Sequence, residues 1–127
     1  IIDYVGVLDC GTPINPNLVR IQAEGGIAQG IGMALWEDVR FDENGKLLND
    51  NFMSYKIPGR LDIRNVRVYL EPTYEPTGPF GAKSVGELVI NTPSPALANA
   101  IENTTGVRLR ELPMTSEKLM MAMSCMR

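Results

Sequence analysis

The stretch Glu24-Gly25-Gly26-Ile27-Ala28-Gln29-Gly30-Ile31-Gly32 lies within a longer segment that has helical spacing, and it contains four glycines. Each glycine disfavours a helix by about 1 kcal/mol relative to alanine, so a helix here needs a compensating contact. Glycine leaves room for a neighbouring backbone or for a ligand, and Gln29 would place an amide with two donors and one acceptor in that room. Two explanations therefore stay open: tight packing of the helix against a sheet, or contact with a polar heterocycle.

The helix that carries this stretch is predicted to span residues 16 to 37 or 38. Asn15 is typical of an N-cap, and Pro16 suits the first helical position because its missing N–H would have no partner there. Upstream, residues 2–9 are rich in β-branched side chains and predict a strand, and residues 9–12 supply turn formers at its end. This first part of the chain is therefore expected to run strand, turn, helix.

Beyond the helix, Asp42-Glu43-Asn44-Gly45 predicts a hairpin turn between short strands at 39–41 and 46–48, because Asn-Gly accepts the positive φ values of tight turns. The remaining expected elements are an extended segment at 51–58, a strand at 66–70, a loop at 72–81, a helix from Thr92-Pro93 to Thr104 closed by Gly106, and a Met-rich helix capped by Thr115. We therefore expect an α+β fold in which about three helices cover one face of a mostly antiparallel sheet, in a two-layer single domain over residues 1–127.

The composition narrows the classes of function. Twelve basic and fifteen acidic residues give a net charge of -3, which provides no general attraction for nucleic acid or anionic lipid. The chain has no histidine, which excludes Ser-His and Cys-His catalysis and the commonest zinc ligand sets. Catalysis would need a carboxylate or a bound cofactor.

Two features bear on the compartment and on the extent of the chain. Cys10 and Cys125 lack the spacing of a disulfide scaffold or a thiolate zinc site, and the apolar stretches are too short for a membrane-spanning helix. We therefore expect a cytoplasmic protein with neither nucleic acid nor membrane as a partner. The first residues already predict a strand and lack an initiator Met, so we expect a segment of a longer protein.

A second unusual segment, residues 78–87, is a glycine-rich loop that ends in Glu87 beside the apolar Leu88-Val89-Ile90. If Glu87 lies where the loop enters apolar surroundings, desolvation would move its carboxyl toward the range useful to a general base. The alternative is a solvated surface glutamate, or one paired with Lys83. Both explanations stay open on the residues alone.

The C-terminal methionines at 120, 121 and 123 are a third feature. Unbranched thioether side chains fill irregular gaps in cores and interfaces, whereas thioether metal sites usually include His or Cys. We expect an adaptable core or an interface here, and no residue of the chain is expected to bind a metal directly.

Taken in order, four motifs resemble the C-terminal region of the molybdopterin-binding subunit of the xanthine dehydrogenase and aldehyde oxidase family, the molybdenum hydroxylases. They are Asp9–Pro16, Glu24–Gly32, Tyr55–Pro58 and Lys83–Glu87. Each motif alone would be weak, but four in the family's order cover nearly all the chain. The resemblance implies that this chain is a C-terminal fragment of such a subunit.

The same resemblance implies a function and its residues. It implies molybdenum-dependent hydroxylation of a purine, N-heterocycle or aldehyde carbon, with water as the oxygen source and Glu87 as the base. The residues expected to bind the cofactor are Gln29 and Gly30 on the helix and Lys83, Ser84, Val85 and Gly86 on the loop. The cofactor would be molybdopterin or its cytosine dinucleotide form, and iron-sulfur clusters and FAD would belong to partner domains or subunits.

One departure from the family pattern is Leu88-Val89, which stand where relatives usually have Pro-Pro. This difference is expected to change the shape of the substrate pocket more than the role of Glu87 as the base. The isolated chain, which lacks the other cofactor-binding loops, is expected to bind no cofactor tightly and to show no turnover. The alternatives are a non-catalytic subunit-interaction or cofactor-loading module of the same fold, and a self-contained small-molecule binder.

Overall fold

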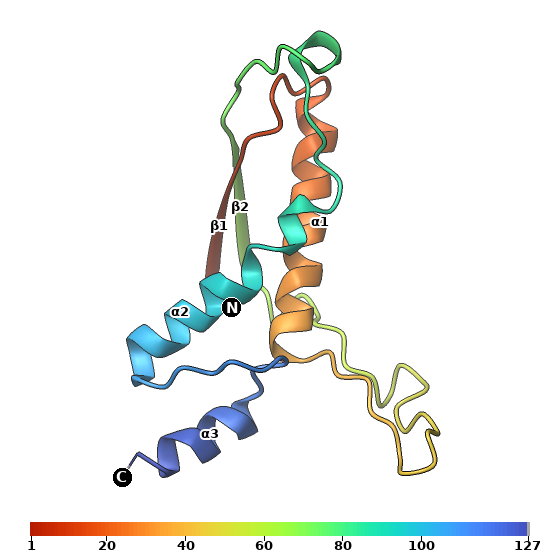
Figure 1. Cartoon of the computed structure of the whole chain (residues 1–127), viewed down its shortest axis with the longest axis vertical. Helices are drawn as coiled ribbons and strands as arrows, with labels where there is room; N and C mark the ends of the chain where they lie inside the picture. Colours follow the sequence, from red (N-terminus) through yellow and green to blue (C-terminus); the bar gives the residue numbers. More distant parts are fainter. Residues whose placement is uncertain (127) are drawn as a thin grey trace. The chain divides into compact units, whose positions relative to one another are not determined.

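The computed structural model describes residues 1–126, and its contacts divide the chain into two compact units. Unit 1 contains residues 1–30 and 59–92, and unit 2 contains residues 31–58 and the chain from 93 onward. The elements, in chain order, are β1 (Asp3–Leu8), α1 (Pro16–Leu35), β2 (Asn65–Leu70), the short 3-10 helices η1 (Pro79–Gly81) and η2 (Leu88–Ile90), α2 (Pro93–Thr105) and α3 (Ser116–Ser124) (Figure 1). The expectation of one domain over 1–127 stays a prediction.

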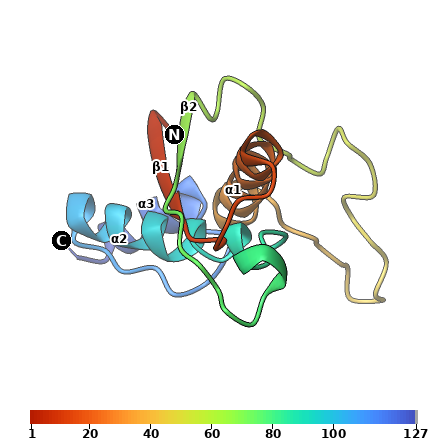
Figure 2. The same cartoon turned by 90° about the horizontal axis from the view of Figure 1, so that it is seen from above.

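In unit 1, β1 and β2 form a two-stranded parallel sheet, in register from Asp3 opposite Asn65 to Leu8 opposite Leu70 (Figure 2). The expectation of a mostly antiparallel sheet is therefore wrong, although the mixed class of helices and strands is confirmed. The reason lies in the connection, because the chain between the two strands includes α1 and brings β2 back in the direction of β1. A crossover of this length is what parallel strands require.

One face of this sheet is open to solvent in the chain. Val5 and Val7 of β1 lie on it with Tyr69 of β2, and Val7 is 71% exposed. On the opposite face, β1 comes close to α1 at Gly6, where an added Cβ would lie 2.8 Å from Cδ1 of Ile27. Parallel sheets are normally covered on both faces, so the open face is unusual for a complete protein.

The predicted start of α1 is confirmed, since the Leu18 amide donates to Oδ1 of Asn15 at 3.1 Å. The helix ends at Leu35, two or three residues earlier than predicted. The next two amides, those of Trp36 and Glu37, both donate to the Gly32 carbonyl at 2.9 Å, which closes the last turn. The N-cap of α1 was predictable because it depends on one side chain, whereas the C-terminal end of the helix depends on this closing turn at Gly32.

The hairpin predicted in unit 2 forms its turn and one antiparallel bridge, but no longer strands. The Gly45 amide donates to the Asp42 carbonyl at 3.0 Å and Gly45 has a φ of 80°, but pairing beyond the turn is a single bridge between Phe41 and Leu47. The strands expected at 39–41 and 46–48 are therefore wrong. Most side chains of residues 39–48 are exposed, so no apolar face stabilises a longer pair of strands.

The segment expected to be extended at 51–58 begins instead with a turn. The amides of Ser54 and Tyr55 both donate to the Asn51 carbonyl, and the Asn51 side chain accepts from the Met53 amide at 3.0 Å. Asparagine commonly replaces a backbone partner in this way, which explains why local chemistry overrides an extended path here.

Helix α2 follows its prediction closely. Its closing residue Gly106 has a φ of 76°, and the Gly106 amide donates to the Glu102 carbonyl at 2.8 Å. Leu97 of this helix is buried, whereas Ala96 and Ala100 are exposed. The predicted start of the helix and its closing glycine are therefore confirmed.

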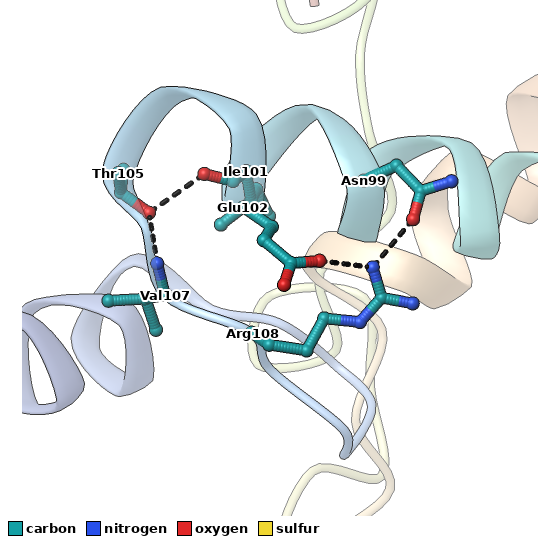
Figure 3. A network of polar contacts seen from close by, with 6 residues as sticks. All are labelled: Asn99, Ile101, Glu102, Thr105, Val107 and Arg108. Carbon is teal, nitrogen blue, oxygen red and sulfur yellow. Dashed lines mark hydrogen bonds and ion pairs between the residues drawn. The ribbon is translucent and has the colours of Figure 1, made fainter.

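A polar network holds the chain that leaves α2 (Figure 3). Nη1 of Arg108 donates to Oδ1 of Asn99 at 2.5 Å and to Oε2 of Glu102 at 2.7 Å. Oγ1 of Thr105 donates to the Ile101 carbonyl at 2.7 Å and accepts from the Val107 amide at 3.2 Å. These contacts fold residues 107–108 back along the last turns of α2.

Helix α3 is capped as predicted, with Oγ1 of Thr115 accepting from the Lys118 amide at 3.3 Å. Met120, Met121 and Met123 are exposed, so they are not a core within residues 1–126. None of the helices in the same described range combines the length and apolar character needed to cross a membrane.

Candidate functional site

The turn after β1 contacts the start of the loop that contains Glu87. Gly11 and Ala82 form an antiparallel bridge, the Lys83 amide donates to the Cys10 carbonyl at 2.7 Å, and the Thr12 amide donates to the Gly81 carbonyl at 2.8 Å. The turn after β1 therefore holds the start of the loop by backbone hydrogen bonds.

Asp9 adds a side-chain anchor at the same place. Oδ2 of Asp9 accepts from Nζ of Lys83 at 2.7 Å, and Oδ1 accepts from the Gly11 amide at 2.9 Å and from Oγ1 of Thr73 at 2.7 Å. These donors lower the pKa of Asp9 to about 2, with Lys83 as the largest cause, followed by Gly11 and Thr73. The sequence indicated Asp9 as a turn former and as the first residue of the Asp9–Pro16 motif, but it did not indicate this anchoring role.

Two glycines permit this close contact. Gly11 has a φ of 66°, and a Cβ there would collide with the Gly81 carbonyl oxygen. Gly81 has a φ of 79°, and a Cβ there would lie 2.9 Å from Oγ1 of Thr12 and would also meet the ring of Tyr74. Side chains at either position would separate the loop from β1.

The far end of the loop is held by α1. Nε2 of Gln22 donates to the Gly86 carbonyl at 3.0 Å. One turn further along the helix, Gly26 lies against Val89, so that a Cβ at Gly26 would collide with Cγ2 of Val89. Glu87 therefore lies between two contacts that join its segment to the glycine-rich helix.

The Glu87 side chain itself is exposed in this chain, at the residue that precedes η2. Of the two explanations left open for Glu87, residues 1–126 show the solvated glutamate and not the apolar setting, while Val89, two positions further on, is buried against Gly26. Of the expected loop residues, Lys83 and Ser84 are exposed, whereas Val85 and Gly86 are half-buried. The Lys83 side chain is paired with Asp9 and not with Glu87.

The helical residues expected to bind the cofactor fall into two environments. Gln29 is exposed on α1, whereas Gly30 is buried. Within residues 1–126, Gln29 makes no hydrogen bond to the loop, which is contacted by Gln22 instead. The two glutamines are seven residues apart, which places them on one face of the helix, roughly 10 Å apart along its axis.

The structure separates the roles of the glycines in α1. Gly26 packs against Val89, and Gly32 lies where a Cβ would be 3.0 Å from Cδ of Pro58 and would meet the Glu37 carboxylate. These two glycines serve packing, but against η2 and against the chain that follows α1, and not against a sheet as the packing explanation expected. Gly25 has nothing within 4 Å of a built Cβ, and it shares the face of Gln22 and Gln29. Packing within this chain therefore does not account for Gly25.

The Tyr55–Pro58 motif is structural within unit 2. The Tyr55 hydroxyl donates to Oε2 of Glu37 at 2.7 Å, and this bond raises the pKa of Tyr55. Pro58 lies beside Gly32, so the motif packs on the last turn of α1. Nothing in these contacts places it in catalysis.

An open groove of about 490 Å³ lies beside the loop in unit 1. Its walls come from the turn after β1, the first turns of α1 and the start of the loop, and its lining includes Ile14, Leu18, Gln22, Lys83 and Val85. Among the described residues, Gln29 and Gly30 do not line it. The structure therefore brings the loop residues of the predicted site together with Gln22, but not with Gln29.

Residues 1–64 match the family of molybdopterin cofactor-binding domains. The chain belongs to this family. It is 40% identical over 121 residues to the probable hypoxanthine oxidase XdhD of Escherichia coli strain K12, covering 94% of this chain and 13% of that protein. It is 42% identical over 117 residues to the aldehyde oxidoreductase of Megalodesulfovibrio gigas, covering 91% of this chain and 12% of that protein.

Among solved structures, this molybdopterin cofactor-binding chain resembles quinoline 2-oxidoreductase from Pseudomonas putida 86 with a TM-score of 0.89 and 35% identity, over 97% of the chain and 16% of that protein. The chain thus spans well under a fifth of these relatives. The family match ends before the loop at 83–87, so similarity in that loop rests on the relatives alone.

The described residues fit a pterin in the chemistry that they offer. Gln29 presents an exposed amide, Gly25 leaves the adjacent helix surface free, and the open space around a Cβ at Gly86 lets a ligand approach the loop backbone. Gln22 was not among the residues predicted from the sequence, although its spacing from Gly25 and Gln29 on one helical face was a usable signal.

Proposed function

We propose that the chain is the C-terminal portion of the molybdenum-binding subunit of a molybdenum hydroxylase, and that Glu87 is its catalytic base. The observation that supports this most is the attachment of the Glu87 segment to the glycine-rich helix at both of its ends, through Gln22 with Gly86 and Gly26 with Val89. The names of the relatives, a probable hypoxanthine oxidase and an aldehyde oxidoreductase, agree with the proposal.

In this proposal the molybdenum cofactor, when bound, supplies the redox chemistry of a hydroxylation that takes its oxygen from water. Glu87 accepts the proton that this reaction releases. Its carboxyl is exposed here, so the remainder of the subunit would supply the surroundings that exclude water and strengthen the base. The exposed carboxyl is accessible to such a neighbour.

The other residues bind and orient. Gln29 would hydrogen-bond the pterin through its side-chain amide. The buried Gly30 has no side chain, so the helix backbone could lie close to the pterin at this position. Lys83, Ser84, Val85 and Gly86 would offer backbone groups near the metal. The Lys83 side chain already neutralises Asp9, so we assign it no charge interaction with the cofactor.

The larger assembly follows from the same proposal. We expect the remainder of the molybdopterin-binding subunit, iron-sulfur and FAD domains or subunits, and a small-molecule substrate as partners, in the cytoplasm. Substrate classes named for the relatives include hypoxanthine, aldehydes and quinoline. A purine, an N-heterocycle or an aldehyde carbon is therefore the substrate class that we propose.

The deciding experiment replaces Glu87 with Gln in the full-length enzyme. The amide keeps the size of the side chain but does not accept the proton, so kcat should fall by roughly a hundredfold or more while molybdenum content stays the same. Glu43→Gln, the same change at the exposed hairpin turn, is the matched control and should leave kcat unchanged. Undiminished kcat in the Glu87 variant would refute the proposal.

One observation favours a second candidate. The exposure of Glu87 in this chain would also suit a non-catalytic subunit-interaction or cofactor-loading module. Such a module predicts that Glu87→Gln leaves turnover intact but changes subunit assembly or molybdenum content. The same set of measurements therefore separates the two candidates.

A further inference from the structure

Gln22 contacts the segment that carries Glu87, but the proposed function gives Gln22 itself no role. It lies on the exposed face of α1, and its Nε2 donates to the Gly86 carbonyl at 3.0 Å across 64 positions of the sequence. Gly86 directly precedes Glu87. The bond therefore joins the helix to the peptide group from which the proposed base begins.

The geometry of that peptide gives the bond a consequence. In a trans peptide the C=O of one residue and the N–H of the next point in opposite directions in one plane. Because the Gly86 carbonyl is held toward Gln22, the Glu87 N–H points away from α1. The bond therefore fixes the plane of the peptide group that leads into Glu87. Gly86 has no side chain to restrict its backbone, and a Cβ there would meet nothing within 4 Å, so we expect this peptide to rotate more readily when the bond is lost.

The bond is not required to keep the helix in place. In unit 1, α1 is already joined to β1 where Gly6 meets Ile27, and to η2 where Gly26 meets Val89. Gln22 is itself exposed, so it buries little surface. Its contribution is the direction of one peptide group and not the packing of the unit.

We propose that Gln22 is a positioning residue that orients Glu87 through the Gly86 carbonyl. The inference rests on the proposed function, because it assumes that Glu87 is the base. It requires a donor at position 22 and no particular contact between Gln22 and the cofactor. Any side chain of suitable length that donates a hydrogen bond should serve.

The test uses three variants of the full-length enzyme. Gln22→Met keeps the length of the side chain and removes the donor, Gln22→Lys restores a donor, and Asn17→Met removes an exposed amide from the first turn of the same helix as a control. The measurements are kcat, KM, molybdenum per chain, melting temperature, and amide hydrogen exchange of Ile90, whose N–H donates to the Glu87 carbonyl at 3.0 Å.

For Gln22→Met we expect kcat to fall roughly 10- to 100-fold, because small misplacements of catalytic groups cost this much. KM, molybdenum content and melting temperature should stay as they are, and amide exchange at Ile90 should become faster. Gln22→Lys should recover most of kcat and most of the protection of the Ile90 amide. Asn17→Met should match the unchanged enzyme.

Unchanged kcat and exchange in Gln22→Met would overturn the inference. A parallel loss of molybdenum or of melting temperature would also overturn it, because Gln22 would then act on cofactor retention or stability. If Glu87→Gln keeps full turnover, the proposed function fails instead. The exchange measurement would still show whether Gln22 holds the loop, so the two failures are distinguishable.

Discussion

Nζ of Lys83 lies 2.7 Å from Oδ2 of Asp9, although 74 positions of sequence separate the two residues. The pair joins the turn after β1 to the loop that leads to Glu87. It is partly exposed, so its net contribution to stability is small, and its main effect is to fix where the loop starts.

The pKa of Asp9 predicts how this anchor responds to acid. Its donors lower the pKa from an ordinary value of 3.8 to about 2, so the folded state is stabilised by the ionised form. That stabilisation is complete above about pH 4 and is lost as the pH falls toward 2. Asp9→Asn should therefore lower the melting temperature of the full-length subunit above pH 4, and the difference should shrink toward pH 2.

Melting curves followed by circular dichroism between pH 2 and pH 6 would measure this difference. Asp38→Asn removes one exposed carboxylate elsewhere on the chain and controls for net charge. A difference for Asp9→Asn that stays constant down to pH 2 would show that the ionised carboxylate is not the anchor.

The neighbouring glycines Gly25 and Gly26 should respond in opposite directions to replacement by alanine. Gly26→Ala forces a Cβ into Val89 and should destabilise the subunit by about 1–3 kcal/mol. Gly25→Ala meets nothing within 4 Å in this chain and should raise stability by roughly 0.5–1 kcal/mol in the apo subunit. Denaturant unfolding of both variants measures these effects, and equal values for the two would contradict the assigned packing.

Gly11 provides a third prediction about the junction of loop and strand. Gly11→Ala has two costs, a left-handed backbone at φ 66° and a collision with the Gly81 carbonyl. Gly45→Ala has only the first, at φ 80° with open space around it, which costs about 1–2 kcal/mol. We expect Gly11→Ala to be the more destabilising in thermal unfolding. The opposite order would mean that the junction is looser than described.

Gln29→Leu tests the cofactor contact apart from the base. Loss of the amide should reduce molybdenum per chain in the full-length enzyme, with little effect on folding because Gln29 is exposed. Asn17→Leu, which removes another exposed amide from α1, should retain the metal. Metal analysis with a melting curve for each variant would settle the point, and full molybdenum content in Gln29→Leu would argue against the contact.

The open face of the sheet gives the last prediction. Val7 is 71% exposed on β1, and a parallel sheet normally has both faces covered. In the full-length subunit we expect this face to be buried, so Val7→Ser should cost about 1.5–3 kcal/mol. A cysteine introduced at Val7 should react with a thiol reagent far more slowly than one introduced at Glu43. Fast reaction at Val7 would show that the face stays open.

Local chemistry made several elements predictable from the sequence. Asn15 and Thr115 cap their helices, and Gly106 closes α2, because each of these roles depends on one side chain and the few backbone groups around it. The order of the four motifs also indicated the family, since it depends on residue identities alone.

Long-range contacts decided the remainder. The parallel pairing of β1 with β2 depends on where a crossover brings the chain back, and no local pattern in residues 2–9 or 66–70 specifies that direction. The strands predicted at 39–41 and 46–48 do not form, for a related reason. Asn44-Gly45 specifies a turn, but longer strands need an apolar layer to pack against, and most side chains of residues 39–48 are exposed.

The sequence by itself determined the caps, the turns and the family, because these are encoded by neighbouring residues. Only the tertiary structure decided that Gln22, and not Gln29, holds the loop, and that Asp9 pairs with Lys83. It also separated the packing glycines from Gly25. The physical reason is that a hydrogen bond or a steric contact depends on distance in space, and the fold brings together residues that are 64 or 74 positions apart along the chain.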